Sequence, residues 1–415
     1  MKTVEQLGIA AKSAAAVLAS ASSEQKNKLL LLAADMLIEN EAELIAENEK
    51  DIQAGKAAGL TDSLLDRLRL TPQRIADMAM GLKEIAMESD PVGEVVEGIK
   101  RPNGIRISKV RVPLGVVGII YEARPNVTAD AFGICLKAGN AVILRGGKEA
   151  IFSNLAIMKV LKAAVQKVGL SEGTVDLVED TSRQSATELM KLKYLDLLIP
   201  RGGASLIRAT VENATVPVIE TGVGNCHAFV DEYADLKMAA SIVENAKCQR
   251  PSVCNALETL LVHKNIAEKA LPMINEALLR HNTEIRGCER TCAILKNALP
   301  VTAEDYATEF LDYVIAVKVV DSLDDAMEHI RKYSTGHSEC IITESYKNAE
   351  RFVNELDAAA LYVNASTRFT DGGQFGMGAE IGISTGKLHA RGPMGIKDLT
   401  TVKFVVRGDG QTRGV

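Results

Sequence analysis

The sequence of 415 residues contains no tryptophan, and aromatic residues make up only 4% of it. Proteins that hold single-stranded nucleic acid stack the bases on aromatic side chains, so this scarcity argues against such a surface. The net charge of −6 also argues against a broad basic surface for nucleic acid. A local basic pocket for a phosphate group remains compatible with both observations.

Long apolar segments are missing as well. No apolar stretch reaches the roughly 18 residues that a membrane-spanning helix needs, so no membrane partner is expected. The apolar run 14–19 is too short for a secretory signal, and Glu5 lies where such signals carry basic residues. The apolar residues between Val4 and Leu18 instead fall on one face of a predicted amphipathic helix.

The seven cysteines fit neither a disulfide framework nor a zinc site. Their number is odd and the chain is long, whereas disulfide-stapled proteins are short and have an even number. Their spacings lack the close CxxC pairs of common zinc sites. We therefore expect reduced thiols, a cytoplasmic location and no metal ion.

The chain is long enough for two or three domains. Its first hundred residues predict helices, one of them capped by Ser22 or Ser23 and another running from Thr71-Pro72 toward Met87. Apolar runs then alternate with helical patterns, which predicts an α/β fold with a doubly wound parallel sheet. The predicted strands of this part are 105–108, 116–121, 141–144, 175–178, 195–199 and 216–219.

A second α/β unit is predicted from about residue 223 to about residue 378. Its strands are predicted at 259–263 and 313–320, and its helices at 267–280 and 323–333. A strand rich in β-branched residues follows at 401–406. We therefore divide the chain into a cofactor-binding domain at 1–222, a catalytic domain at 223–378 and a C-terminal return at 379–415.

Cys254 is the strongest candidate for a reactive side chain. Lys247 and Arg250 precede it, and nearby cations lower the pKa of a thiol and favour the thiolate. Pro251 restricts the backbone on the approach to Cys254. The alternative interpretation is a buried core thiol, and the residues alone leave both open.

Two glycine-rich loops each follow a predicted strand and precede a predicted helix. Glycine lets the backbone approach a ligand, and a helix N-terminus attracts phosphate, so the pair favours a nucleotide. Neither loop matches GxGxxG or the Walker pattern, and ordinary turns are the alternative. The residues are Arg145, Gly146, Gly147 and Lys148 in one loop and Arg201, Gly202 and Gly203 in the other.

Three further polar residues lie near the predicted strands. Glu220 follows the strand at 216–219 and is either a general base or a structural ion-pair partner. Arg368 lies in a loop with small hydroxyl residues, where it either holds a carboxylate in its fork or is a solvated surface residue. His337 has no Ser or Cys partner in the sequence, so we interpret it as structural or as polar lining.

Several segments, in the same order along the chain, resemble the aldehyde dehydrogenase superfamily. They are VPLGVVGII at 112–120, KAGNAVIL at 137–144 and TEFL at 308–311. Three more stretches resemble one branch of it, the γ-glutamyl phosphate reductase family: YEARPNVT at 121–128, QRPSVCNALET at 249–259 and GIKDLTT at 395–401. The resemblance implies a Rossmann-type cofactor domain, an α/β catalytic domain and a small oligomerisation element that includes the strand 103–112.

The resemblance also implies roles for individual residues. Cys254, not Cys248, falls on the nucleophile, and Asn126 is the expected side-chain donor to the oxyanion. The segment 145–149 replaces a lysine–proline–serine–glutamate motif of NAD-linked relatives, which suits the 2′-phosphate of NADPH. The expected cofactor-binding residues are Arg145, Gly146, Gly147, Lys148, Arg201, Gly202, Gly203, Glu220 and Glu309. The expected substrate-binding residues are Arg124, Arg250 and Arg368.

The reaction implied by the resemblance is the NADPH-dependent reduction of L-glutamyl 5-phosphate, the second step of proline biosynthesis. Cys254 displaces phosphate to form a thioester, Lys247 or Arg250 stabilises the departing phosphate, and L-glutamate 5-semialdehyde is released. A homo-oligomer and an association with glutamate 5-kinase are further expectations. The alternatives are a hydrolytic, NAD-linked aldehyde dehydrogenase and a nucleotide-binding protein without catalysis.

Overall fold

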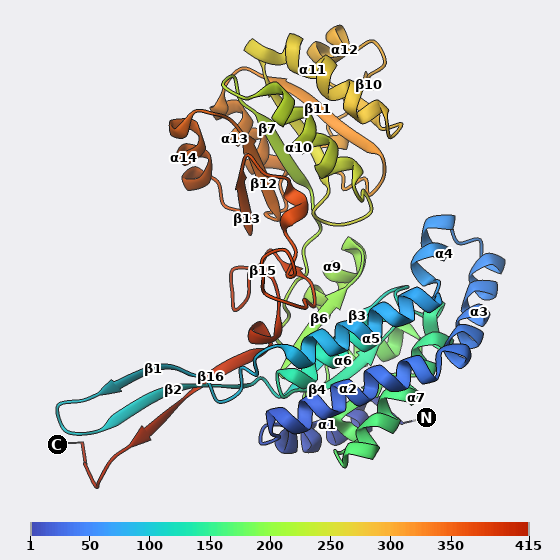
Figure 1. The fold of residues 1–415 in the computed structure, drawn as a ribbon, viewed down its shortest axis with the longest axis vertical. Helices are drawn as coiled ribbons and strands as arrows, with labels where there is room; N and C mark the ends of the chain where they lie inside the picture. The colour runs from blue at the N-terminus through green and yellow to red at the C-terminus, as the bar shows by residue number, and fades with distance from the viewer. Residues whose placement is uncertain (1, 414–415) are drawn as a thin grey trace. The chain divides into compact units, whose positions relative to one another are not determined.

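The computed structural model describes residues 2–413, and the chain divides into two compact units (Figure 1). The first unit contains the residues up to Glu220, Met377–Gly382 and the residues from Met394 onward. The second unit contains Thr221–Gly376 and Ile383–Pro393. The predicted C-terminal segment 379–415 is thus divided between both units. Thr221 bridges Ser384, and Ile383 pairs with Pro393, which ties residues 383–393 to the second unit.

Five helices open the first unit. They are α1 (Val4–Leu18), α2 (Ser23–Glu39), α3 (Glu41–Ala57), α4 (Asp62–Leu68) and α5 (Pro72–Met87). The Ser22 side chain accepts a hydrogen bond from the Gln25 backbone N–H, and the Thr71 side chain accepts one from that of Arg74. Both predicted caps are therefore confirmed.

A four-stranded parallel sheet follows, in the order β5-β4-β3-β6. Its strands are β3 (Val116–Tyr121), β4 (Ala141–Arg145), β5 (Val175–Leu177) and β6 (Leu197–Arg201). The helices between and after them are α6 (Asn126–Lys137), α7 (Ile151–Val168), α8 (Arg183–Met190) and α9 (Ala204–Asn213). This alternation confirms the predicted α/β fold.

The strand predicted at 216–219 is wrong. Only one isolated bridge forms there, between Leu198 and Val218. Two backbone hydrogen bonds hold it, from Leu198 N–H to the Pro217 carbonyl and from Ile219 N–H to the Leu198 carbonyl. Because Pro217 has no N–H to donate, the segment cannot continue as a paired strand.

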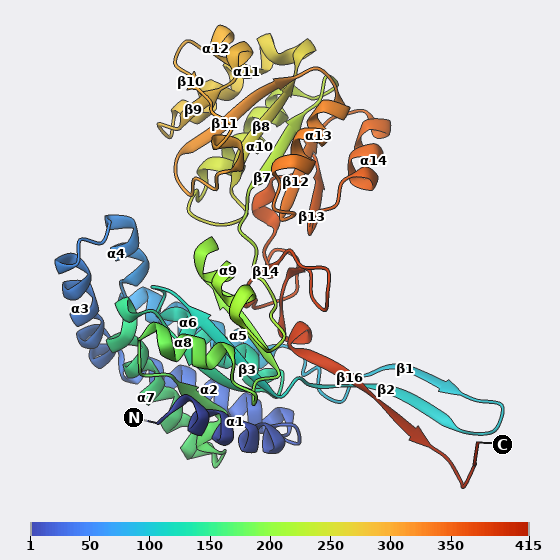
Figure 2. The ribbon, with the colours of Figure 1, turned by 180° about the vertical axis from the view of Figure 1, so that it is seen from behind.

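A separate antiparallel sheet, which we call the arm, belongs to the first unit (Figures 1 and 2). Its strands are β1 (Val95–Lys100), β2 (Arg106–Pro113) and β16 (Thr400–Arg407), with β2 in the middle. The sequence predicts part of β2 and most of β16, but it does not predict β1. Glycine, glutamate and lysine in β1 weaken its strand pattern, and every residue of β1 is exposed.

The second unit contains a seven-stranded sheet in the order β10-β9-β11-β8-β7-β12-β13, and all its pairs are parallel. The strands are β7 (Cys226–Val230), β8 (Leu257–His263), β9 (Glu284–Gly287), β10 (Leu299–Pro300), β11 (Val314–Val320), β12 (Ser338–Ile342) and β13 (Ala360–Val363). The main helices are α10 (Leu236–Cys248), α11 (Lys264–Leu279), α12 (Glu289–Ile294), α13 (Leu323–Tyr333) and α14 (Tyr346–Glu355).

Helices cover both faces of this sheet. Ala228 and Val230 of β7 pack in one apolar cluster with residues of α10 and α11. Phe229, which points to the opposite face of the same strand, packs in another cluster with residues of α13 and α14. A parallel sheet covered in this way is doubly wound, which fits the α/β unit predicted for this part of the chain.

Candidate active site

Cys254 lies in the connection from α10 to β8, at the amino end of β8. Its side chain is partly exposed, whereas Cys248, the last residue of α10, is buried with its Sγ 3.4 Å from the Thr283 hydroxyl. Burial raises the pKa of the Cys248 thiol, which keeps it protonated. Of the two cysteines in this segment, Cys254 is therefore the one whose thiol a substrate can reach.

The backbone of Cys254 is closely packed. The Cys226 thiol donates to the Cys254 carbonyl oxygen at 3.2 Å. A Cβ atom added to Gly224 would lie 1.4 Å from the same oxygen, so only glycine fits at that position. The next residue, Asn255, is held by the loop after β13, since the Thr367 hydroxyl donates to its carbonyl at 2.7 Å.

Two arginines lie beside this segment. The Arg368 guanidinium donates to Gln249 Oε1 at 2.8 Å and also to Asn255 Oδ1. Burial lowers the pKa of Arg368, and the charge of Arg250 acts in the same direction, whereas that of Cys254 opposes it. Arg250 itself is exposed. The arrangement offers positive charge and guanidinium forks next to a thiol, which suits an anionic acyl substrate.

Lys247 does not have the role that the sequence predicts for it. Its ammonium group is completely buried and lies 2.6 Å from Glu258 Oε2. Burial raises the pKa of Glu258 to about 7, and Lys247 opposes that shift. A buried, paired ammonium cannot meet a departing phosphate, so the structure argues against this role for Lys247.

Glu309 is hydrogen-bonded to the segment just before β7, close in sequence to Cys226. Its Oε1 accepts a hydrogen bond from the Gly224 N–H at 2.8 Å. Phe310 follows, with Lys247 Nζ 6.0 Å and Arg286 Cζ 5.2 Å from its ring centre. Leu311 adopts a left-handed backbone with φ of 54°, and its N–H donates to Glu258 Oε1 at 3.3 Å. The segment 309–311 is thus fixed against the nucleophile segment by backbone and buried side chains.

The predicted loop after β4 lies in the first unit. Arg145 donates through one guanidinium nitrogen to the carbonyls of Thr181 at 2.7 Å and Ser182 at 3.0 Å. Its Nε is buried and has no partner among the described residues. A Cβ on Gly146 would lie 2.1 Å from Asn154 Nδ2, so that glycine is needed for internal packing. Lys148 is exposed.

The loop after β6 holds a carboxylate of the protein itself. Glu122 Oε2 accepts a hydrogen bond from the Gly203 N–H at 2.9 Å, just before α9 begins. A Cβ on Gly202 would lie 2.6 Å from the same carboxylate. Arg201 precedes these glycines, and its charge acts on Asp130. The anion-attracting end of α9 is therefore already engaged by Glu122.

Asn126 begins α6, directly after β3, and is exposed. Its amide donates to Asp130 Oδ2 at 2.9 Å. Arg124, two residues before it, is exposed, and so is Glu220 at the end of the first unit. The residues predicted in the first unit thus follow β3, β4 and β6, which are neighbours in the sheet. Positive side chains at this carboxyl edge fit a phosphate-bearing nucleotide.

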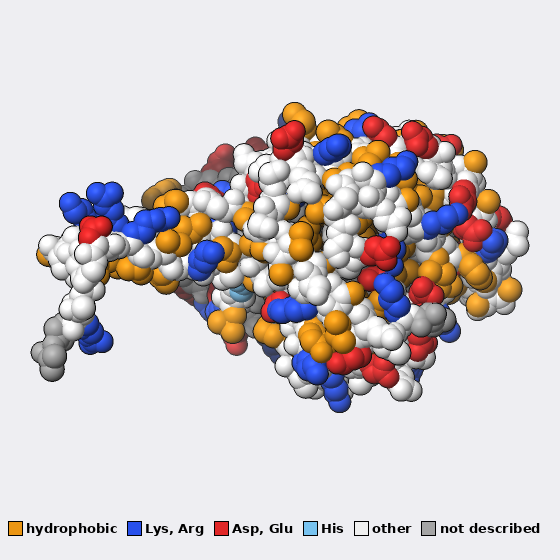
Figure 3. All heavy atoms as spheres, turned by 90° about the horizontal axis from the view of Figure 1, so that it is seen from below, with side chains coloured by type: hydrophobic (Ala, Val, Ile, Leu, Met, Phe, Trp, Pro, Cys, Tyr) orange, Lys and Arg blue, Asp and Glu red, His pale blue; other side chains and the backbone are white. Residues whose placement is uncertain are grey.

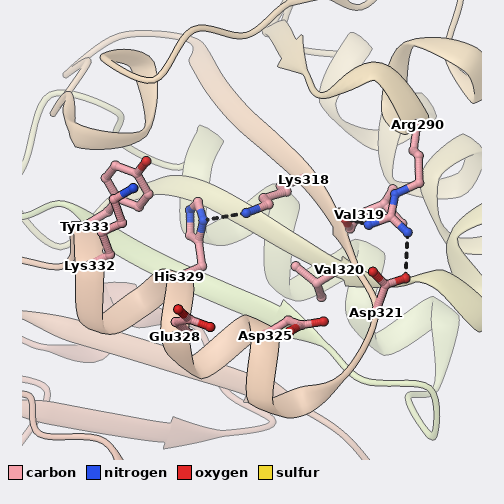
Figure 4. A pocket seen from close by; sticks show the side chains of 10 residues that line it. All are labelled: Arg290, Lys318, Val319, Val320, Asp321, Asp325, Glu328, His329, Lys332 and Tyr333. Atoms are coloured by element: carbon pink, nitrogen blue, oxygen red, sulfur yellow. Dashed lines mark hydrogen bonds and ion pairs between the residues drawn. The ribbon is translucent and has the colours of Figure 1, made fainter.

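A cavity of about 350 Å³ lies elsewhere in the second unit (Figure 4). It is lined by the carboxyl end of β11 and by α13, whereas Cys254 lies at the amino end of the neighbouring strand β8. Arg290 pairs with Asp321 at 2.8 Å, and the Lys318 ammonium donates to His329 Nδ1 at 3.2 Å. Burial lowers the pKa of His329 to about 3, so it accepts as the neutral ring. Arg290, Asp321 and Lys318 thus have partners within the protein, while His329 Nε2 is buried without one among the described residues, and we assign no ligand to the cavity.

The described residues contain no cluster of three or more His, Cys, Asp or Glu side chains arranged to hold a metal ion. No helix among residues 2–413 is long and apolar enough to cross a membrane.

Gly224, Cys226 and Asn255 were not predicted as site residues. The only signal for them is that polar or small residues directly precede the neighbouring strands β7 and β8.

Comparison with known proteins agrees with this architecture. The model of the aldehyde dehydrogenase family matches residues 1–286. The γ-glutamyl phosphate reductase of Heliobacterium modesticaldum is 60% identical over 98% of both chains, and that of Carboxydothermus hydrogenoformans is 59% identical over 100% of both. The crystal structure of γ-glutamyl phosphate reductase from Thermotoga maritima is 51% identical and superposes with a TM-score of 0.95 over 98% of this chain and 99% of that one. The chain therefore belongs to the aldehyde dehydrogenase family and, within it, to the γ-glutamyl phosphate reductases.

Proposed function

We propose that this chain reduces L-glutamyl 5-phosphate to L-glutamate 5-semialdehyde with NADPH, through a thioester on Cys254. The activity follows from membership in the γ-glutamyl phosphate reductases, with 59–60% identity along nearly the whole chain. One observation supports the thioester most strongly. Cys254 is a partly exposed thiol at the amino end of β8, with two arginines beside it.

In the first step, Cys254 Sγ forms a bond to the acyl carbon and the bond from that carbon to the phosphate oxygen breaks. The phosphate leaves with the bonding electron pair, and Arg250 stabilises its charge. Because an acyl phosphate is already activated, no water molecule has to be activated. Glu220 therefore has no general-base role in this proposal, which is consistent with its exposed position.

The negative charge that develops on the acyl oxygen needs hydrogen-bond donors. We assign this role to the backbone N–H of Cys254 and to the side-chain amide of Asn126. Arg368 is our candidate for the α-carboxylate of the substrate, because Gln249 and Asn255 fix its guanidinium in one orientation. Arg124 is the second candidate.

The residues of the first unit fit NADPH as a phosphate-bearing nucleotide. Lys148 is exposed and free to turn toward the 2′-phosphate, while Arg145 and Arg201 add positive charge at the ends of β4 and β6. These loops contain four glycines that let the backbone approach the cofactor: Gly146, Gly147, Gly202 and Gly203. We assign Glu309, from the second unit, to the ribose beside the nicotinamide. Glu220 is assigned to the cofactor as well. When bound, NADPH supplies the hydride that reduces the thioester. Cys254 then leaves the reduced carbon, and the semialdehyde is released.

The reverse assay tests the proposal. Wild type and Cys254→Ala are given glutamate 5-semialdehyde and NADP, with and without inorganic phosphate, and NADPH formation is followed by absorbance. We expect formation that requires phosphate and is absent in the variant. Formation without phosphate would point to a hydrolytic aldehyde dehydrogenase. No formation by the folded wild type would favour a nucleotide-binding protein without catalysis.

We further propose that the chain forms a homo-oligomer through the arm. Ile99, Ile107 and Val406 are paired across its three strands on one face, and Phe404 on the same face is 66% exposed. Cationic side chains also gather on the arm (Figure 3). Residues 94–113 and 400–413 carry a net charge of +5, whereas the whole chain carries −6, so the remainder carries −11. A basic, partly apolar arm suits the acidic remainder of a second copy.

Light scattering coupled to size-exclusion chromatography measures this association. Phe404→Glu should lower the average mass, and added salt should weaken the oligomer further because charge attraction contributes. Tyr346→Glu is the matched control, since Tyr346 is 79% exposed and lies on α14 of the second unit. An unchanged mass for Phe404→Glu would exclude the arm as the contact.

Two further proposals concern the setting of the reaction. An acyl phosphate hydrolyses readily, so an association with the glutamate 5-kinase that makes it would shorten its exposure to water. The nucleophile must remain a thiol, and this favours a reducing compartment, the cytoplasm.

A further inference from the structure

Cys226 is the first residue of β7, and it lies opposite Leu257 at the start of β8. Its side chain is completely buried. The Sγ atom is 3.2 Å from the Cys254 carbonyl oxygen and 3.8 Å from His337 Nδ1. A thiol has one hydrogen to donate, and the shorter distance directs it to the carbonyl of the nucleophile.

The Cys226 thiol is a permanent donor. Burial raises its pKa well above the usual value, and the nearby charges of Glu339 and Cys254 act in the same direction. It therefore stays protonated over the pH range in which Cys254 is a useful nucleophile. The two cysteines thus have separate roles: Cys254 is exposed enough to react, whereas Cys226 is buried and unreactive.

Other groups restrain the same stretch of backbone. The Cα of Gly224 packs so closely that no side chain fits between it and the Cys254 carbonyl. From the loop after β13, the Thr367 hydroxyl donates to the Asn255 carbonyl at 2.7 Å, and Asn255 Nδ2 donates to the Thr370 carbonyl at 2.9 Å. The carbonyls of the consecutive residues 254 and 255 are therefore held by different donors, one from β7 and one from the loop after β13.

We propose that Cys226 is a positioning residue for Cys254. By holding the Cys254 carbonyl, its thiol fixes the peptide plane between Cys254 and Asn255 and so aligns Cys254 Sγ with the acyl carbon. Cys226 itself acts only through Cys254. The inference rests on the proposed role of Cys254 as nucleophile and adds a second cysteine that the reaction needs but does not consume.

The physical reason is alignment. A reacting sulfur must lie about 3–3.5 Å from the acyl carbon with its orbital directed at it, and small rotations of the peptide move it away. Without the Cys226 donor, the closely packed Cys254 carbonyl loses this hydrogen bond. The peptide between Cys254 and Asn255 can then rotate to find another donor. The thiol of Cys254 remains present and accessible, but it is aligned in a smaller fraction of molecules.

The test compares Cys226→Ser, which keeps a donor, with Cys226→Ala and Cys226→Val, which remove it at two different volumes. We measure kcat and KM in the reverse assay and the rate of iodoacetamide alkylation at Cys254, followed by peptide mass spectrometry across pH. The donorless variants should lose about tenfold in kcat with little change in KM, and Cys226→Ser should stay within about threefold of wild type. Alkylation at Cys254 should remain within about twofold in all three, because only alignment changes.

Cys340 provides the matched control. It lies on the adjacent parallel strand β12, is equally buried, and its thiol donates to the Ala365 carbonyl at 3.1 Å. Cys340→Ala should lower the melting temperature about as much as Cys226→Ala but leave kcat closer to wild type. The proposal is overturned if Cys226→Ala and Cys226→Val keep the wild-type kcat, or if Cys226→Ser falls as far as they do. Failure of the proposed function is distinguishable, since the wild type would then form NADPH without phosphate or not at all, and failure of Cys254 as the nucleophile would leave Cys254→Ala active.

Discussion

The candidate residues occupy opposite kinds of sheet edge in the two units. In the first unit they follow β3, β4 and β6, and α6, α7 and α9 begin shortly afterwards. Helix N-termini attract anions, but Asp51 already engages the start of α7 and Glu122 that of α9, so exposed side chains such as Lys148 add the charge for an anionic cofactor. In the second unit Gly224, Cys254 and Glu309 precede β7, β8 and β11, whereas Arg368 reaches the nucleophile segment from the loop after β13. Charge must come there from side chains such as Arg250 and Arg368.

The two edges also differ in how their loops are fixed. The segment with Cys254 is held by buried groups, including the Lys247–Glu258 pair at its two ends. The loops of the first unit expose Lys148, Gly202 and Gly203. A reacting sulfur needs one fixed position, whereas a cofactor loop must admit a large ligand. Substitutions at matched positions in the two units test this difference.

The largest effect is expected from Lys247→Met. Breaking this buried pair leaves the Glu258 carboxyl without its partner, so that it must take up a proton at neutral pH, and the free energy of unfolding should fall by about 3–5 kcal/mol. Lys26→Met is the matched change in the first unit, because Lys26 is also completely buried and lies 2.6 Å from Asp90. Urea denaturation measures both losses. Only Lys247→Met should also disturb alkylation at Cys254, and equal disturbance by Lys26→Met would contradict the separation of the two units.

Gly224→Ala comes next. Its Cβ would overlap the Cys254 carbonyl oxygen, so the nucleophile segment must move, and kcat should fall at least about 100-fold. Gly81→Ala is the control in the first unit, because Gly81 lies in α5 and no atom is within 4 Å of the added Cβ. That variant should keep its activity within about twofold. Steady-state kinetics in the reverse assay measure both variants. A small loss of kcat in Gly224→Ala would show that the nucleophile segment is not rigid.

Arg368→Lys should raise KM for the semialdehyde about 10- to 100-fold with a smaller change in kcat. Lysine keeps the charge but loses the planar fork, which Gln249 and Asn255 orient in the wild type. Arg351→Lys is the control, because Arg351 makes exposed ion pairs with Asp324 and Glu355 on the surface. If Arg124→Lys raises KM instead, the second candidate for the carboxylate is the correct one.

The helices and most strands could be predicted because their periodicity and caps are local. The residues from Val4 to Leu18 show a helical apolar face, and Thr71-Pro72 caps α5 as expected. Predictions failed where pairing depends on distant partners. Segment 216–219 looks apolar, yet Pro217 limits it to one bridge, and β1 is held mainly by pairing with β2. Asp176, which interrupts the apolar run of β5, is buried and paired with Lys162 of α7.

The sequence predicted the reactive residues of the candidate site but not the residues that hold them in place. Cys254 and Arg368 stood out because charge and small polar residues surround them in sequence. The supports Gly224, Cys226 and Thr367 lie 30, 28 and 113 residues from Cys254, and only the parallel pairing of β7 with β8 and the loop after β13 bring them together. Lys247 was misjudged because its partner Glu258 lies on the far side of the loop.

The smallest effect is expected at Asp130, near Asn126. Burial raises the pKa of Asp130 to about 6, with partial relief from the Asn126 amide and from Arg201. The folded protein therefore binds this proton more tightly than the unfolded chain does. The resulting stability is fully present below the ordinary carboxyl pKa and is lost as pH rises through about 6. Asp130→Asn should thus be more stable than wild type at pH 8, by about 1 kcal/mol after allowance for solvent screening, with no advantage near pH 4. Urea titrations at the two pH values measure the difference, and an advantage that is independent of pH would show that Asp130 is charged throughout.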